Sequence, residues 1–267
     1  MSTDALTMNS AAGLSDARAH PSAVRHITTI AKRELTSYFA SPVAYVFIVF
    51  FLLLCGFFTF MVGRFFQRGE ASLIAFFIWH PWLYLFLVPA VGMRTWSEER
   101  RLGTIELLLT MPITPWQAIV GKFVASWLFL AIALALTFPL VLTVGYLGSP
   151  DYGVVVCGYL GSLLMAGAYL AISCMTSALT RNQVISFILS VVACLFLILA
   201  GWPPVTDMLV QWAPNWLVEG VAAFSVMPHF ESFQRGVIDS RDLVYFLSVI
   251  AFSLFTTGVI IRSHRAG

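Results

Sequence analysis

An uncharged apolar run over residues 43–62 constrains this chain more than any other feature of its sequence. The run has the length, about 20 residues, at which a helix crosses a hydrocarbon core about 30 Å thick. Five further runs have the same character. The predicted spans are 43–62, 73–93, 123–147, 154–179, 184–201 and 243–261. None alternates apolar and polar side chains as barrel strands do, so the sequence predicts an all-α integral membrane protein with six transmembrane helices.

The composition agrees with this fold class. Hydrophobic residues make up 59% of the chain and charged residues only 10%, whereas soluble domains carry about 25% charged residues. The net charge of +2 gives no signal for nucleic acid as a partner. Residues 1–21 contain Asp4, Asp16 and Arg18 without a continuous apolar core, so we expect a flexible cytoplasmic tail rather than a signal peptide.

The basic residues predict the orientation of the spans. Four of the 15 Lys and Arg side chains, Arg64, Arg68, Arg235 and Arg241, fall on one side. The other eleven fall on the opposite side: Arg18, Arg25, Lys32, Arg33, Arg94, Arg100, Arg101, Lys122, Arg181, Arg262 and Arg265. By the positive-inside rule the larger set is cytoplasmic. The sequence therefore predicts a multi-pass protein of the cell (inner) membrane with both termini in the cytoplasm.

Two segments outside the spans have helical periodicity. In 22–41 the apolar residues Val24, Ile27, Ala31, Leu35 and Tyr38 recur at helical spacing, while Arg25, Lys32 and Arg33 occupy other faces. We predict an amphipathic helix on the inner leaflet, ended by Pro42, rather than an ordinary basic flank. The segment 202–242 is too apolar for a solvated loop and is interrupted by prolines, so we expect short external helices before the last span.

The segment 94–122 carries the clearest functional signal. Charged residues open it, Gly103 interrupts it, and Thr104 is placed to start a second short helix. Thr114 and Gln117 have the spacing of a capping box with proline in the first helical position. So much ordered structure between two spans favours a loop that docks onto another protein over a solvated connection.

The residues SEERRLGTIELLLTMPIT and the following GKF resemble the intracellular loop of ABC-2-type transporter permeases, closest to the gliding-motility-associated branch. AKRELTSYFASPVAYV near the N-terminus and FESFQRGVIDSRDLVYF near the C-terminus are similar to the same family. The resemblance implies a six-span permease domain over 42–267, an N-terminal elbow helix, a coupling helix and external helices before the last span. It further implies two paired permease halves, each seated on an ABC ATPase subunit.

Carried onto this chain, the resemblance places the coupling region at 96–111. Its candidate residues are Trp96, Glu98, Glu99, Arg100, Arg101, Gly103, Thr104 and Glu106. The elbow helix would contribute Arg25, Lys32 and Arg33. The partners implied are a cytoplasmic ATPase subunit, a second permease half that is the same or a related chain, and membrane lipid.

The chain lacks the phosphate-binding glycine loop of ATPases, because Gly121-Lys122 is followed by Phe123 and has no upstream glycine. We therefore expect no catalytic residue, no metal and no bound cofactor in this chain, with ATP and magnesium on the partner subunit. The expected function is an ABC permease moving an unidentified substrate, with export favoured. The alternatives are an anchor or assembly component driven by an ATPase, and an ATP-independent channel or carrier.

Within the predicted spans, polar signals are few. His80 lies near the middle of the second span beside Pro81. We interpret it as a neutral imidazole bonded to a neighbouring helix at a kink, with a polar contact on a substrate path as the alternative. Small residues recur along 154–179, which favours close packing of that helix within the subunit.

Overall fold

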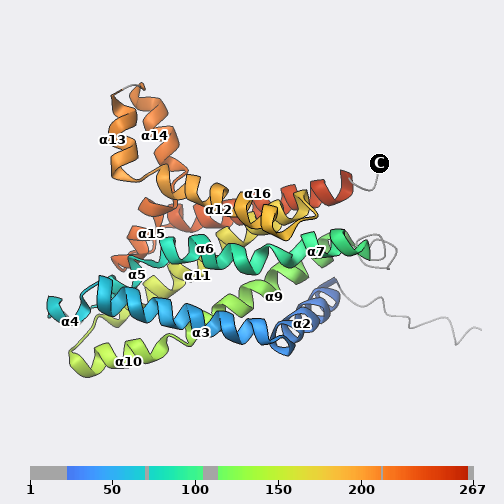
Figure 1. The fold of residues 1–267 in the computed structure, drawn as a ribbon. Helices are drawn as coiled ribbons and strands as arrows, with labels where there is room; N and C mark the ends of the chain where they lie inside the picture. The colour runs from blue at the N-terminus through green and yellow to red at the C-terminus, as the bar shows by residue number, and fades with distance from the viewer. Residues whose placement is uncertain (1–22, 70–71, 105–113, 212, 264–267) are drawn as a thin grey trace, which may run out of the picture.

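The computed structural model describes residues 23–69, 72–104, 114–211 and 213–263. Every regular element in these ranges is a helix (Figure 1). The elements are α2 (Ala23–Ala40), α3 (Pro42–Phe57), the π-helical turn η1 (Phe58–Val62), α4 (Phe65–Arg68), α5 (Ile74–Phe77), α6 (His80–Gly92), α7 (Arg94–Leu102), α9 (Pro115–Ala135), α10 (Phe138–Leu147), α11 (Tyr152–Leu179), α12 (Gln183–Leu199), α13 (Pro203–Val210), α14 (Asn215–Ala223), α15 (Val226–Gln234) and α16 (Ser240–Ser263).

The prediction of an all-α membrane protein is confirmed. Four segments are long and apolar enough to cross a bilayer: Pro42–Gln67, Pro115–Leu147, Tyr152–Leu179 and Ser240–Ser263. A fifth is reached if α12 and α13, which meet at a bend of 67°, form one broken span. The count of six stays a prediction, because the expected span at 73–93 is divided between the four-residue α5 and the 13-residue α6.

The third span begins earlier than expected. The sequence suggested a start at residue 123, but α9 begins at Pro115, where the Thr114 N–H donates to Gln117 Oε1 over 3.0 Å. Lys122 was assigned to the preceding loop and instead lies inside the helix, buried. The same span breaks between α9 and α10 beside Pro139, as a proline that cannot donate its backbone N–H requires.

Helix α11 lies at the centre of the bundle. It is in contact with α6, α7, α9, α12, α15 and α16. Its small residues are buried, and a Cβ built on Gly158 or Gly161 would lie 2.5 Å from the ring of Phe77 or from Cβ of Phe233. The small-residue pattern is therefore used for packing inside the chain.

Different helices lie at the two ends of the bundle (Figure 1). The helices α2 and α7 and the C-terminal end of α16 lie at one end, while α4 and α15 lie at the other (Figure 1). At that second end the helices α13 and α14 form a hairpin that projects from the bundle (Figure 1). The helix α7, with which the segment 94–122 begins, therefore lies at the same end as α2.

Candidate functional site

The site is built around α7, which follows α6 after a single intervening residue, Met93. Gly103 ends α7 in the left-handed region at φ 71°, and its N–H donates to the Glu99 carbonyl. A residue with a Cβ is disfavoured in that conformation, which explains why a glycine stops the helix here. The expected interruption at Gly103 thus fixes the length of α7.

The start of α7 is capped by another helix. Met93, at the N-cap position, offers no side-chain hydrogen bond. Instead Ser177 Oγ of α11 accepts the N–H groups of Trp96 and Ser97, each over 3.0 Å, and donates to the Met93 carbonyl over 2.8 Å. N–H groups in the first turn of a helix have no partner within the helix. The Ser177 side chain therefore joins the central helix to the backbone at the start of α7.

Arg100 makes a second bond between the same two helices. Its guanidinium donates to the Ala178 carbonyl near the C-terminus of α11. A cation at that position also meets the negative end of the helix dipole. Partial burial, followed by the nearby Arg181, lowers the pKa of Arg100, although an arginine stays protonated at physiological pH.

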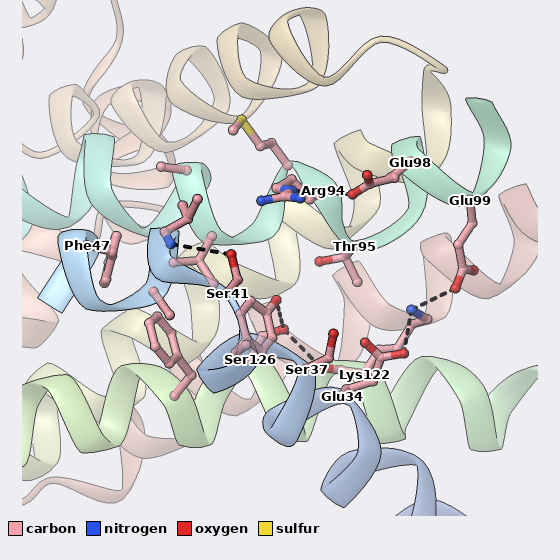
Figure 2. Close-up of a pocket in the computed structure, with 17 residues that line it drawn as sticks. Glu34, Ser37, Ser41, Phe47, Arg94, Thr95, Glu98, Glu99, Lys122 and Ser126 are labelled. Atoms are coloured by element: carbon pink, nitrogen blue, oxygen red, sulfur yellow. Dashed lines mark hydrogen bonds and ion pairs between the residues drawn. The ribbon is translucent and has the colours of Figure 1, made fainter. Parts of the chain in front are cut away.

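Lys122 joins three helices through ion pairs (Figure 2). Its Nζ lies 2.8 Å from Glu99 Oε1 of α7 and 3.0 Å from Glu34 Oε1 of α2. The lysine side chain is 8% exposed and the two carboxylates 23% and 20%. The ammonium also lies 5.6 Å from the ring centre of the buried Trp96. Two carboxylates from separate helices thus share one largely buried cation, which we call the Lys122 clamp.

The solvent side of α7 has a different set of charges. Glu98 pairs with Arg94 at 3.3 Å and more loosely with Arg101 at 3.9 Å. Arg101 and Leu102 are exposed at the end of the helix. Arginine is one of the residues enriched at protein interfaces, and the exposed end of α7 carries one beside an apolar side chain.

Helix α2 packs against α9 through its apolar face. Tyr38 stacks on Phe129 with ring centres 5.1 Å apart, and the hydroxyls of Tyr38 and Ser126 lie 2.9 Å apart. A Cβ on Gly121 would lie 2.8 Å from Ile30, so a glycine in α9 permits this close approach. The apolar face of the expected elbow helix is thus largely engaged by protein.

A cavity of about 450 Å³ opens between α2, the start of α3, α7 and α9 (Figure 2). Its charged lining comes from Glu34, Arg94, Glu98, Glu99 and Lys122. Its apolar lining includes Val43, Ala44, Phe47, Val91 and Phe129. The Lys122 clamp therefore forms one wall of an amphipathic pocket.

A family model described as ABC-2 family transporter protein matches residues 72–233, which is more than half of the chain. The chain belongs to the ABC-2 transporter family. No curated protein matches it as a relative. As a family member the chain is a multi-pass membrane component of an ABC transporter, the class of transporter that works with an ATP-binding-cassette partner. The gliding-motility branch stays a prediction.

The structure of this ABC-2 chain separates the expected coupling residues into two groups. Trp96, Glu99 and Arg100 contact other helices of the chain, whereas Glu98 pairs with Arg94 and Arg101 of its own helix. Arg101 and, beyond Gly103, Thr104 are exposed. Glu106 lies outside the described residues, as does most of the expected second short helix. The docking role stays a prediction for all of them.

The remaining expected residues are placed as follows. Arg25, Lys32 and Arg33 are exposed on α2. His80 is fully buried at the start of α6, and its Nδ1 lies 2.9 Å from the Phe76 carbonyl of α5. The hydrogen bond of the imidazole therefore goes to the short helix just before it. Its Nε2 has no partner among the described residues.

The sequence analysis did not identify two residues whose side chains bond α7 to other helices, Lys122 and Ser177. Lys122 was treated as a loop charge, and Ser177 as one of several small packing residues. The signal that could have identified Lys122 is its position, between a capping box and an apolar helix, where a cation cannot remain unpaired. No local pattern marks Ser177.

Proposed function

We propose that this chain is the permease subunit of an ABC transporter and that a separate cytoplasmic ATPase subunit drives it. The observation that supports the proposal is the attachment of α7. One short helix is bonded to α11 through Ser177 and Arg100 and to α2 and α9 through Lys122. A displacement of α7 would therefore act on the central helix and on two others at once.

ATP and magnesium belong to the partner in this proposal. Closure of two ATPase subunits would move the α7 helices of two permease halves, and the attached spans would switch access from one side of the membrane to the other. The permease has no catalytic residue in this scheme, because the energy comes from ligand-driven closure of the partner. Export of a substrate is the favoured direction.

The proposed orientation places α2, α7 and both termini in the cytoplasm. The excess of basic residues at that end supports it. Single cysteines at Gly103 and at Gly148, in a cysteine-free background, give the test. A membrane-impermeant reagent applied outside intact cells should label the Gly148 site and leave the Gly103 site unlabelled. The reverse pattern would overturn the orientation.

The docking surface is proposed to be the exposed end of α7. The test is the double substitution Arg101→Glu with Leu102→Asp, because neither side chain takes part in the Lys122 clamp or in the bonds to α11. The variant should insert and fold normally, yet lose the ATPase subunit that co-purifies with the wild-type chain. Arg235→Glu is the matched control, since Arg235 is also exposed and directly follows α15, which lies at the other end of the bundle. Full co-purification and full ATP-driven activity in the double variant would contradict docking through α7.

A further inference from the structure

The turn between α11 and α12 lies beside α7, and the two together bring arginines to one surface. Arg100 of α7 donates to the Ala178 carbonyl near the end of α11. Arg181 follows in the turn and is exposed, while Arg100 is half-buried. Burial has the larger effect in lowering the pKa of Arg100, and the neighbouring charge of Arg181 lowers it further. Two guanidinium groups therefore lie near each other at this surface.

The chain supplies no carboxylate to these two arginines among its described residues. Glu98 pairs with two other arginines of α7, and Glu99 pairs with Lys122 of α9. The stretch 152–199, which contains both α11 and α12, has neither Asp nor Glu. Like charges repel each other, so an anion that contacts both guanidinium groups is attracted by both.

Exposed apolar side chains border the two arginines. Leu102 at the end of α7 is 63% exposed, and Leu179 at the end of α11 is 52% exposed. Leu179 directly follows Ala178, to which Arg100 is bonded. We call the combined surface the α7–turn surface; it consists of Arg100, Arg101, Leu102, Leu179 and Arg181.

A stable protein interface needs more surface than α7 alone provides. Each partner typically contributes about 800 Å², or about 20–30 residues. Helix α7 has 9 residues, and its first turn is bonded to α11. The α11–α12 turn adjoins the end of α7, because Arg100 bonds α7 to the end of α11. A partner that docks on the end of α7 can therefore extend over this turn.

We propose that the ATPase subunit binds the α7–turn surface through acidic side chains, and that one of its carboxylates lies between Arg100 and Arg181. The inference rests on the proposed function, to which it adds the chemistry of the partner and a second docking element. The planar guanidinium group binds a carboxylate through two parallel hydrogen bonds. A protein carboxylate is favoured over a lipid phosphate, because the surface continues the exposed end of α7 and includes leucines that a layer of headgroups would leave unpacked.

A zero-length cross-link tests the chemistry of the contact. Arg181→Lys keeps the charge and supplies a primary amine, which a carbodiimide joins only to a carboxylate that touches it. The experiment uses the full chain in complex with the ATPase subunit that co-purifies with the wild-type chain. Mass spectrometry should find position 181 joined to an Asp or Glu of the ATPase, with no such product from the wild-type chain. An intact complex of this variant without the cross-link would overturn the proposal.

Charge reversal tests how much the contact contributes to binding. Arg181→Glu should raise the dissociation constant of the ATPase about tenfold, because a charge-assisted contact is replaced by repulsion. Arg25→Glu is the matched control, since Arg25 is likewise exposed at the same end of the bundle but lies on α2. Equal affinity of Arg181→Glu and the wild-type chain would contradict the contact.

Salt provides a second measurement of the same contact. Raising the salt concentration from about 0.1 M to about 1 M shortens the Debye length from about 10 Å to about 3 Å. The wild-type complex should weaken over this range, and the Arg181→Glu complex should weaken less. An affinity of the wild-type chain that does not change with salt would count against an acidic partner surface.

The outcomes separate this inference from the proposed function. If Arg101→Glu with Leu102→Asp loses the ATPase while Arg181→Glu retains full affinity, docking through α7 stands and the acidic contact at Arg181 is refuted. If no ATPase co-purifies with the wild-type chain, both are refuted. If Arg181→Glu weakens binding to phosphatidylglycerol vesicles and leaves the affinity for the ATPase unchanged, the arginines contact lipid and the proposal is wrong.

Discussion

Lys122 of α9 lies 2.8 Å from Glu99 of α7, so the helix proposed to meet the ATPase is held by a charge inside a span. The same ammonium holds Glu34 of α2. Breaking an ion pair that is largely buried costs more than breaking a surface pair, because the remaining charges lose their partner without regaining water. The first prediction concerns this clamp, and the others concern separate contacts between helices.

Lys122→Met should destabilise the chain, because Glu99 would lose the cation it pairs with and Glu34 would keep only the exposed Arg33. The expected loss is about 2–3 kcal/mol, less than for a fully buried pair because both carboxylates are partly exposed. Thermal unfolding of the purified chain in detergent measures it. Adding Glu34→Gln and Glu99→Gln to Lys122→Met should restore most of the lost stability. If the triple variant is as unstable as Lys122→Met, the ion pairs are not the cause.

Ser177→Ala should loosen α7 from α11, because the N–H groups of Trp96 and Ser97 would lose their acceptor. Loss of a helix cap costs about 1–2 kcal/mol. Hydrogen exchange should become faster at the start of α7. Ser173→Ala is the control, since the Ser173 hydroxyl donates to the Tyr169 carbonyl of its own helix and to no other described residue. Equal exchange at α7 in both variants would refute capping by Ser177.

Gly92→Ala should destabilise the packing of α6 on α11. The new Cβ would lie 2.3 Å from Ser173 Cβ, so one helix must shift, at a cost of about 1–3 kcal/mol. Gly56→Ala in α3 is the matched control, because nothing lies within 4 Å of its added Cβ. Helix propensity alone would make that control neutral or slightly stabilising. Equal melting temperatures for the two variants would contradict the close approach.

Tyr245→Phe should loosen the projecting hairpin and leave the bundle unchanged. The Tyr245 hydroxyl donates to the Phe224 carbonyl at the end of α14 over 2.6 Å. The ring stacks on His229, which pairs with Asp242 at 2.6 Å. Losing the hydroxyl should cost about 1 kcal/mol, seen as faster hydrogen exchange in α14 with no change in α11. Tyr146→Phe, at an exposed site on α10, should change neither.

Much of the fold could be predicted from the sequence because long apolar runs admit only one kind of structure in a bilayer. The runs around Val43 and Val154 predicted helices that the structure places within two residues of their expected starts. Gly103 and Thr114 likewise marked helix ends through local backbone chemistry. The second span was harder to predict. A hydropathy average reports how apolar a segment is and does not show that its helix is interrupted before His80.

The sequence by itself determined the membrane class, the family resemblance and the placement of most helices, because these depend on local composition and short motifs. Only the tertiary structure decided which charges are available to a partner. Glu98 and Glu99 are neighbours in sequence, yet one pairs with arginines of its own helix and the other pairs with Lys122 of α9. Ser177 reaches α7 only because α11 packs there. Side-chain partners are set by the packing of helices distant in sequence, and a single sequence contains no local signal for such pairs.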